Sequence, residues 1–440
     1  MSEQLDFDVI IVGAGLVGAS FALAMRDSGL RLALVESAIA LEPPSEWINR
    51  VYAVSPGSVE FLHEIGAWSK FDVDRIAPVR KMHIHGDDGK AYLEFDAHGS
   101  GLAELAVIAE ARWMQYGLWQ ALQRQENLML FCPARCARLR LQDEIAVVRL
   151  EDGRELRAPL VVGADGRDSW VRSQAGMDAE PAPYRQMGVI ANFETELPHH
   201  DAAWEWFRGD GVLAFLPLAG NREGQSRGPS GDATPKRDAG APAAVAGIPS
   251  TGRSPFGEPS ADAPGRHRVS IVWTAFEEVA AELMALPPDE FSQRVQAAGR
   301  DALGKLRLLN KPAAFPLRLL HLEHLVKPRV ALIGDAAHNV HPLAGQGVNL
   351  GFQDARELAK VLKDRGPQPD CGDYFLLRRY ERARKADVLA MQLVTDGLQK
   401  LFNNRNPALK LARNWGLSLT GGMSWLKNSL VQHAVGRHLS

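Results

Sequence analysis

Cysteine is scarce in this sequence: there are only three in 440 residues, at positions 132, 136 and 371. Three cysteines cannot form the disulfide framework of a small secreted protein, and a reducing cytoplasm fits such usage. Cys132 and Cys136 lie four positions apart without further cysteine or histidine ligands nearby, which argues against a zinc site. We therefore predict two small buried hydrophobic residues in a cytoplasmic protein.

An excess of charge of either sign is also lacking. Lysine and arginine number 50 against 53 aspartate and glutamate residues, so the formal net charge is only −3. A basic composition of the kind that favours nucleic-acid binding is not present. We expect no nucleic-acid partner.

Long apolar runs of the membrane-spanning type are not evident either. The segment Val9–Met25 carries no charge, but it is rich in glycine and alanine. It is preceded by Glu3, Asp6 and Asp8, where an export signal would carry basic residues. Neither an export signal nor a spanning helix is predicted.

The first sixty residues contain a motif typical of dinucleotide binding. An apolar strand is predicted over Phe7–Val12, followed at once by the glycine motif Gly13–Gly18. A helix over Ala19–Ser28 and a second strand over Arg31–Val35 come next, and the second strand is followed by Glu36. A strand, a glycine motif, a helix and an acid in this order indicate a Rossmann-like unit.

Each residue of the motif has a physical role in this interpretation. Gly13 makes the tight turn, Gly15 lets a pyrophosphate approach the backbone, and Gly18 allows the helix to pack on the strand. Glu36 lies at the separation in sequence from the glycine motif that is expected for an acid that accepts hydrogen bonds from an adenosine ribose. The motif alone does not distinguish FAD from NAD.

Two further acids follow apolar strands much later in the chain. Asp165 follows Leu160–Gly163, and Asp335 follows Val330–Ile333. An FAD molecule lying extended across the sheet could use both acids, whereas a bound NAD would have no need of them. An ordinary α/β core in which these turns serve packing alone stays open as the alternative.

Glycines and a predicted helix follow Asp335. The backbone N–H groups of Gly345, Gly347, Val348 and Asn349 would face the negative charge of a reduced flavin ring at a helix N-terminus. We predict that His338 packs and hydrogen-bonds behind this turn, and the same for His341, because no third metal ligand is evident.

Short β-rich segments predict a second domain. The segment Arg80–Phe95 is predicted as a hairpin around Asp88 and Gly89. Further strands are predicted over Met187–Phe193, Ala203–Phe207, Val212–Leu216 and Val269–Phe276. Together they indicate a mainly antiparallel sheet over the flavin, with Trp204 and Trp206 packing on one strand.

The overall prediction is an α/β fold: a discontinuous Rossmann-like FAD-binding domain with an inserted antiparallel β domain. Residues 1–78, 100–180 and 306–385 would form the FAD-binding domain, and residues 79–99 and 181–305 the substrate domain. Residues 222–266 hold seven prolines and few large apolar residues, so they predict a disordered insertion. A linker or docking role for the insertion stays open.

The C-terminal region, residues 386–440, is predicted to be helical. Basic residues gather just before it, at Arg378, Arg379, Arg382, Arg384 and Lys385, and apolar residues follow. This pattern fits a membrane surface or a protein partner, and it fits equally a capping helix pair packed on the FAD-binding domain.

Three motifs resemble those of single-component flavoprotein aromatic hydroxylases, the para-hydroxybenzoate hydroxylase-like group. They are Gly13–Gly18 with Glu36, GADGRDSWVR at residues 163–172, and GDAAHNVHPLAGQGVNLG at residues 334–351. The last motif, NRVYAVSPGSVEFLHEIGAW at residues 49–68 and the segment from residue 380 to residue 402 resemble the ubiquinone-biosynthesis hydroxylases in particular.

The resemblance implies roles for several residues. Arg50 and Arg112 would lie beside the flavin, Asp165 near the cofactors and Asp335 on the FAD ribitol. The family usually has Glu-Asn-Arg where this chain has Ala111 between its Glu and Arg. The candidate cofactor-binding residues are Gly13, Gly15, Gly18, Glu36, Arg50, Arg112, Asp165, Asp335, Gly345, Gly347, Val348 and Asn349. No catalytic side chain and no metal ligand is proposed.

The resemblance also implies an activity. NAD(P)H would reduce FAD and leave, and O₂ would then form a C4a-hydroperoxyflavin that hydroxylates a polyprenylated phenol in ubiquinone biosynthesis. Two alternatives stay open: a hydroxylase of another small aromatic, and a non-catalytic flavoprotein scaffold of a quinone-synthesis complex. Other quinone-biosynthesis proteins and the inner-membrane surface are the partners that this interpretation suggests.

Overall fold

A six-stranded, mostly parallel sheet carries the glycine motif. The computed structural model describes residues 5–87, 91–177, 182–220, 267–339, 347–366 and 370–402. Within these residues the strand order is β19-β20-β12-β1-β2-β8, and only β19 runs antiparallel to its neighbour. The strands are β1 (Val9–Val12), β2 (Leu32–Val35), β8 (Leu128–Phe131), β12 (Leu160–Gly163), β19 (Val326–Lys327) and β20 (Val330–Leu332). The four inner strands β20, β12, β1 and β2 are wholly buried, as expected for parallel strands covered on both faces.

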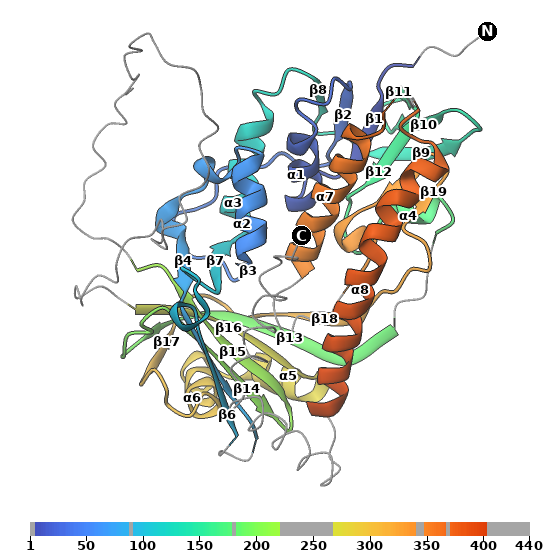
Figure 1. Ribbon diagram of the computed structural model, residues 1–440. Coiled ribbons are helices and arrows are strands. Elements are labelled where there is room, and N and C mark those ends of the chain that lie inside the picture. Colours follow the sequence, from blue (N-terminus) through green and yellow to red (C-terminus); the bar gives the residue numbers. More distant parts are fainter. Residues whose placement is uncertain are drawn as a thin grey trace, which may run out of the picture.

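Helices pack around this sheet in the upper part of Figure 1. Helix α1 contacts both α3 and α7, and α7 contacts α8. Their bounds are α1 (Leu16–Ala24), α2 (Pro56–Glu64), α3 (Ala111–Leu122), α4 (Trp170–Gln174), α7 (Gly347–Lys363) and α8 (Tyr374–Phe402). Helix α1 begins directly after Gly15 and ends at Ala24, so our prediction of Ala19–Ser28 was displaced toward the C-terminus. The helix begins there because the motif's turn already ends at Gly15.

An eight-stranded sheet forms the lower part of the described structure (Figure 1). Its order is β17-β13-β16-β15-β14-β5-β6, with β18 paired to β13, and only the β14–β5 pair is parallel. The strands are β5 (Lys81–His85), β6 (Tyr92–Asp96), β13 (Ala182–Thr195), β14 (Ala202–Arg208), β15 (Gly211–Leu218), β16 (His267–Phe276), β17 (Leu306–Leu308) and β18 (Ala313–Leu319). The mainly antiparallel sheet predicted from the sequence is confirmed.

Two small sheets complete the β structure of the described residues. One joins β3 (Val51–Val54), β7 (Ala106–Glu110) and β4 (Ile76–Val79), and the other joins β9 (Cys136–Leu141), β10 (Ala146–Leu150) and β11 (Glu155–Ala158). Single 3₁₀ turns are η1 (Trp68–Lys70), η2 (Val73–Arg75), η3 (His98–Ser100) and η4 (Gly334–Ala336). Neither small sheet was predicted, because their strands are short and lack clear alternation.

Three apolar clusters hold these layers together. The largest surrounds the six-stranded sheet and its helices. The second lies between the eight-stranded sheet and helices α5 (Glu277–Ala285) and α6 (Pro288–Ala298), and it includes Trp206 and Trp273. The third joins the β3–β7–β4 sheet to the other face of the eight-stranded sheet, through Val79, Ile108 and Ala203. Trp206 therefore packs as predicted.

Helix α8 spans both parts of the molecule. In Figure 1 it runs from the six-stranded sheet down past the eight-stranded sheet. The basic cluster predicted at its start is divided: Arg384 is buried, whereas Arg379, Arg382 and Lys385 are exposed. Arg384 therefore takes no part in an exposed basic surface, whereas the other three basic residues remain exposed, and the described part of α8 packs on α7. Residues 403–440 of the predicted helical region and the insertion 222–266 lie outside the described residues, Gly220 being the last residue described before the insertion.

Candidate functional site

Four parallel strands end at one edge of the six-stranded sheet. Val12 pairs with Val35 and with Gly163, and Gly163 pairs with Leu332, so β1, β2, β12 and β20 end in register. The residues that follow these four strands are, in that order, Gly13, Glu36, Ala164 with Asp165, and Ile333 with Asp335. Segments more than 300 residues apart in the chain therefore meet where open α/β sheets bind ligands.

The glycine motif combines close packing with open space. Gly13 has φ +100°, and a Cβ added there would lie 2.5 Å from the Ala164 carbonyl oxygen. A Cβ at Gly18 would lie 2.0 Å from the Gly13 carbonyl oxygen. A Cβ at Gly15, in contrast, would meet nothing within 4 Å, although Gly15 is the N-cap of α1. The helix start is thus open, without a side-chain cap, and fits an anionic pyrophosphate.

Glu36 ties the end of β2 to the glycine turn. Its Oε2 accepts a hydrogen bond of 2.7 Å from the Ala14 N–H, and its Oε1 accepts one of 3.0 Å from the Ala38 N–H. Such charge-assisted bonds hold the turn in shape. The contact with an adenosine ribose stays a prediction, because each oxygen also has a local partner.

Both carboxylate oxygens of Asp165 accept hydrogen bonds within the turn that follows β12. Its Oδ1 accepts from the Ser169 hydroxyl at 2.5 Å, and its Oδ2 accepts from the Val171 N–H at 3.0 Å, at the start of α4. Arg172 then donates to the Ala336 carbonyl at 3.0 Å, which connects this turn to the Asp335 turn. The acid therefore shapes the site locally, and its contact with a cofactor remains a proposal.

Tyr52, which we did not single out from the sequence, lies within the electrostatic influence of Asp335. Burial raises the pKa of the Tyr52 hydroxyl, nearby Arg50 lowers it, and the Asp335 carboxylate raises it again. The Arg50 guanidinium lies 5.4 Å from the centre of the Tyr52 ring. Arg50, Tyr52 and Asp335 therefore form a group of polar side chains at the carboxyl edge. The signal was present in residues 49–68, which include Tyr52.

Arg50 and Arg112 come from paired strand ends. The Ala111 N–H donates to the Arg50 carbonyl at 2.9 Å, and Arg112 is exposed in the first turn of α3. Glu110 beside them is buried and accepts from Arg75 at 3.1 Å. Burial raises the pKa of the Glu110 carboxyl, and the Ile48 N–H and Arg75 oppose that shift. This ion pair stabilises the β3–β7 corner that presents the two arginines.

The start of α7 is fastened to β3 by one side chain. Asn349 is buried; its Oδ1 accepts from the Ser55 N–H and its Nδ2 donates to the Ala53 carbonyl, both at 2.9 Å. Gly347 and Val348 form the first turn of α7, where backbone N–H groups lack partners within the helix. Asn349 thus positions the helix end with its side chain, beyond the backbone role predicted for it. Gly345 and His341 lie outside the described residues.

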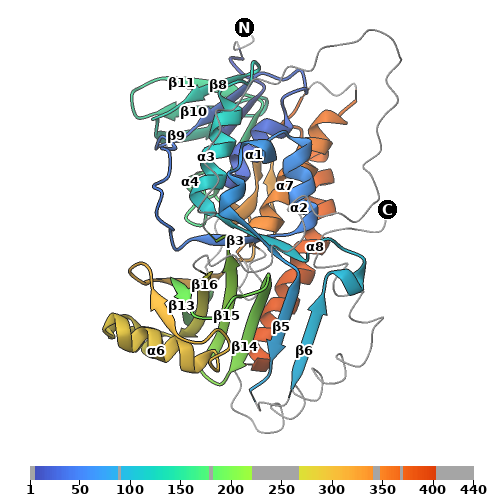
Figure 2. The ribbon, with the colours of Figure 1, turned by 90° about the vertical axis from the view of Figure 1, so that its left-hand side faces the viewer.

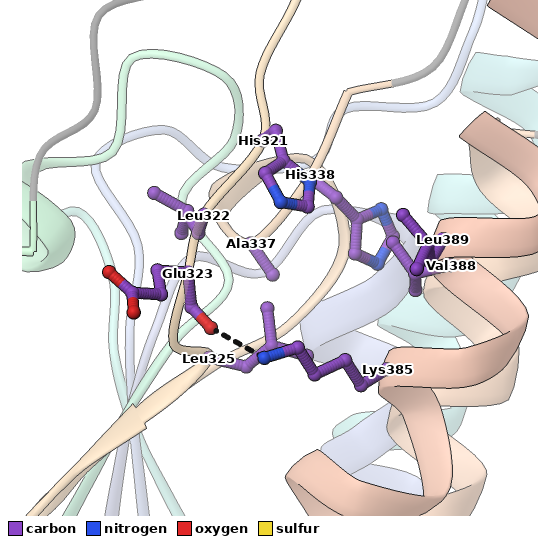
Figure 3. Close-up of a pocket in the computed structure, with 9 residues that line it drawn as sticks. All are labelled: His321, Leu322, Glu323, Leu325, Ala337, His338, Lys385, Val388 and Leu389. Atoms are coloured by element: carbon purple, nitrogen blue, oxygen red, sulfur yellow. Dashed lines mark hydrogen bonds between the residues drawn. The ribbon is translucent and has the colours of Figure 1, made fainter. Parts of the chain in front are cut away.

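A buried ionic group lies behind the Asp335 turn. The imidazole Nε2 of His338 lies 2.6 Å from Asp354 Oδ2, and Arg384 Nε donates to Asp354 Oδ1 at 2.8 Å. Burial opposes the charge of Asp354, but His338 and Arg384 outweigh it and lower the Asp354 pKa. Figure 3 shows His338 beside Val388 and Leu389 of α8. This confirms the packing role predicted for His338, and no metal-binding cluster occurs within the part of the chain that the structure describes.

Comparison with known proteins identifies the family. The family model described as an FAD binding domain matches residues 6–394. The chain belongs to this FAD-binding family.

Two full-length relatives of this FAD-binding protein are named as a hydroxylase and a monooxygenase. It is 30% identical to the 3-demethoxyubiquinol 3-hydroxylase of Escherichia coli, over 98% of each chain. It is 31% identical to the mitochondrial ubiquinone biosynthesis monooxygenase of Mus musculus, over 98% of this chain and 92% of that one. The family and the relatives together show an FAD-dependent monooxygenase.

Solved structures confirm the fold. The p-nitrophenol 4-monooxygenase of Pseudomonas putida gives a TM-score of 0.70 at 17% identity, with 99% of this chain and 100% of that chain covered. PqsL of Pseudomonas aeruginosa gives 0.69 at 22% identity, with 93% and 99% covered. At such identities the likeness shows the architecture alone. Among the described residues, no helix has the length and apolar character needed to cross a bilayer.

Proposed function

We propose that this protein uses NAD(P)H and O₂ to hydroxylate the aromatic ring of a polyprenylated phenol in ubiquinone biosynthesis. The observation that carries the proposal is the match over 98% of each chain to a relative named 3-demethoxyubiquinol 3-hydroxylase. The carboxyl edge of the six-stranded sheet supports it, because the open α1 start and the Asp335 turn meet there. FAD supplies the redox chemistry when it is bound.

The chain's own residues would bind, orient and shield. Gly15 and the start of α1 would take the pyrophosphate, while Asp335 and the first turn of α7 would hold the flavin end. Arg50 and Tyr52 would border the ring, since Tyr52 interacts electrostatically with Asp335 and Arg50 lies 5.4 Å from the centre of the Tyr52 ring. The eight-stranded sheet would cover the ring and exclude water from the substrate. Because a prenyl tail is strongly apolar, we also propose that the enzyme works at the inner-membrane surface.

A coupled assay tests the proposal. The purified holoprotein should oxidise NAD(P)H faster when a phenol with a short prenyl chain is added, and should place one oxygen atom from labelled O₂ into its ring. A strain lacking the protein should accumulate a quinone precursor that lacks one ring hydroxyl. A purified protein that binds FAD but leaves both the phenol and the quinone precursors unchanged would support the scaffold alternative instead.

The two acids at opposite ends of the cofactor should respond differently to excess FAD. Asp335→Ala should weaken FAD binding about ten- to a hundredfold, because a charge-assisted hydrogen bond contributes about 1.5–3 kcal/mol. Saturating FAD should restore turnover only in part, since the ring would be less well held. Glu36→Ala should also bind FAD weakly but should recover full turnover. Equal and complete recovery of both variants would contradict the placement of Asp335 beside the ring.

A further inference from the structure

Strand β14 carries one carboxylate, that of Glu205, on the face of its sheet toward the FAD-binding part of the molecule. Side chains alternate along a strand, and Trp204 and Trp206 point into the core beneath α5 and α6. Glu205 therefore lies on the opposite face, together with Ala203. Ala203 packs in the cluster that joins this sheet to β3, β4 and β7. In Figure 2 this sheet lies below the segment labelled β3, with α6 on its other side.

That face lies close to the segment that carries Arg50. Asn192 lies on the same face of the sheet, on β13, three strands away from β14, and it donates from Nδ2 to the Ile48 carbonyl at 2.9 Å. Val51 and Ala53 of β3 pack in the same cluster as Ala203. Glu205 is two residues along β14 from Ala203, which corresponds to about 7 Å. The carboxyl thus lies on the face of the sheet that packs against β3, the strand that follows Arg50.

The surroundings of Glu205 are apolar. Its neighbours in register are Ile84 on β5 and Ala214 on β15, and the same row continues to Val272 and Ile190. These four side chains keep partial solvent exposure although their strands lie inside the sheet. The row is therefore not filled by packing from the layer above. An apolar row of this kind suits an aromatic ring and an apolar chain.

Glu205 itself is buried without a partner. It is only 5% exposed, and among the described residues it has no hydrogen bond or ion pair. Burial alone raises the pKa of its carboxyl to about 8. The group is therefore protonated at neutral pH, and it can both donate and accept a hydrogen bond. A buried polar group left unpaired destabilises the fold, so its presence calls for a ligand.

We propose that the Glu205 carboxyl binds a hydroxyl group of the substrate's phenolic ring, with Ile84 and Ala214 against the ring or its tail. This inference rests on the proposed function, because it assumes a phenolic substrate. It deepens that function by assigning a substrate-recognition residue on the β14 face. A purely structural role is less consistent with the geometry, since the carboxyl holds no other element of the described chain.

The test pairs two changes, one in the protein and one in the ligand. Glu205→Leu keeps the side-chain volume but removes hydrogen bonding, and Glu205→Gln keeps hydrogen bonding. Glu282→Leu, on the exposed face of α5, is the matched control. The ligands are a phenol with a short prenyl chain and its methyl ether. Binding to each holoprotein is measured from the change in flavin absorbance, alongside the KM, kcat and melting temperature.

The wild type and the control should bind the phenol about ten- to a hundredfold more tightly than the ether. Glu205→Leu should lose most of that discrimination and raise the KM, while its melting temperature stays equal or rises. Glu205→Gln should stay within about threefold of the wild type, because its amide still forms one hydrogen bond. If Glu205→Leu still discriminates as the wild type does, the assignment of Glu205 is overturned. If the wild type itself neither binds nor hydroxylates the phenol, the proposed function fails, and the inference fails with it.

Discussion

Gly15 and Gly18 of the motif have different roles, one in cofactor binding and one in packing. Two alanine substitutions should distinguish these roles. Gly18→Ala should lower the melting temperature of the apoprotein, because its Cβ would lie 2.0 Å from the Gly13 carbonyl oxygen. Gly15→Ala should leave the apoprotein's melting temperature unchanged, since a Cβ there meets nothing and the backbone conformation suits alanine. Its FAD affinity should fall instead. A comparison of melting curves with FAD titrations checks this, and an unchanged FAD affinity of Gly15→Ala would contradict the pyrophosphate position.

Glu205 should also leave a signature in the pH dependence of stability. The folded carboxyl has a pKa of about 8 against an ordinary value of 4.5, because it is buried between Ile84 and Ala214. The folded state therefore keeps a proton that the unfolded state loses, so stability falls as the pH rises from 4.5 through about 8. At about 1.4 kcal/mol per pKa unit, the penalty is on the order of several kcal/mol.

The Glu205→Leu variant removes that penalty. Its advantage in melting temperature over the wild type should widen between about pH 5 and about pH 8 and then level off. Thermal unfolding of both apoproteins across this range measures it. A constant difference would show that the carboxyl is ionised or paired in the folded protein.

At the scale of elements, the group of His338, Asp354 and Arg384 joins η4, α7 and α8. Asp354 is fully buried, and its Oδ2 also accepts from the Gly334 N–H at 3.0 Å. Tyr380 of α8 adds a hydrogen bond of 2.9 Å to the Leu332 carbonyl at the end of β20. The turn that presents Asp335 is therefore held from behind by two helices.

Removing one charge from this group should lower the free energy of unfolding. Asp354→Asn should destabilise the protein by about 3–5 kcal/mol, because Arg384 would lose its buried counter-ion. Glu64→Gln is the matched control at the surface, since Glu64 pairs with Arg356 of α7 where both side chains are 45% exposed. That change should cost less than about 1 kcal/mol. Denaturant unfolding of both variants measures the contrast, and similar losses would show that the buried group does not hold the turn.

At the scale of the whole molecule, the register of the eight-stranded sheet predicts that the insertion at residues 222–266 can be shortened. Leu218 at the end of β15 pairs with Arg268 at the start of β16, so the chain leaves and re-enters the sheet at adjacent positions. Replacing residues 228–264 with a short flexible link should leave FAD content intact and change the melting temperature by only a few degrees. The reason is that loop-closure entropy depends weakly on loop length. A large loss of stability or of bound FAD would show that the insertion packs on the enzyme.

The local pattern of the chain determined the cofactor-binding framework. Apolar strands that end in glycine or acid are short-range features, and β1, β2, β12 and β20 form where they were expected. The alternation of β13 to β16 likewise predicted the antiparallel sheet. Such features depend on residues near in sequence, so they can be recognised without the fold.

Only the tertiary structure decided which polar groups meet. Tyr52 interacts electrostatically with Asp335, Asp354 pairs with Arg384, and Asp165 is engaged within its own turn. The basic cluster on α8 divides because Arg384 turns inward to a carboxylate thirty residues away. Glu205 belongs to no sequence motif. Its proposed role depends on the face of β14 on which it lies and on the layer that packs against that face. Pairing and burial of this kind result from contacts between distant segments, which no local pattern in the sequence specifies.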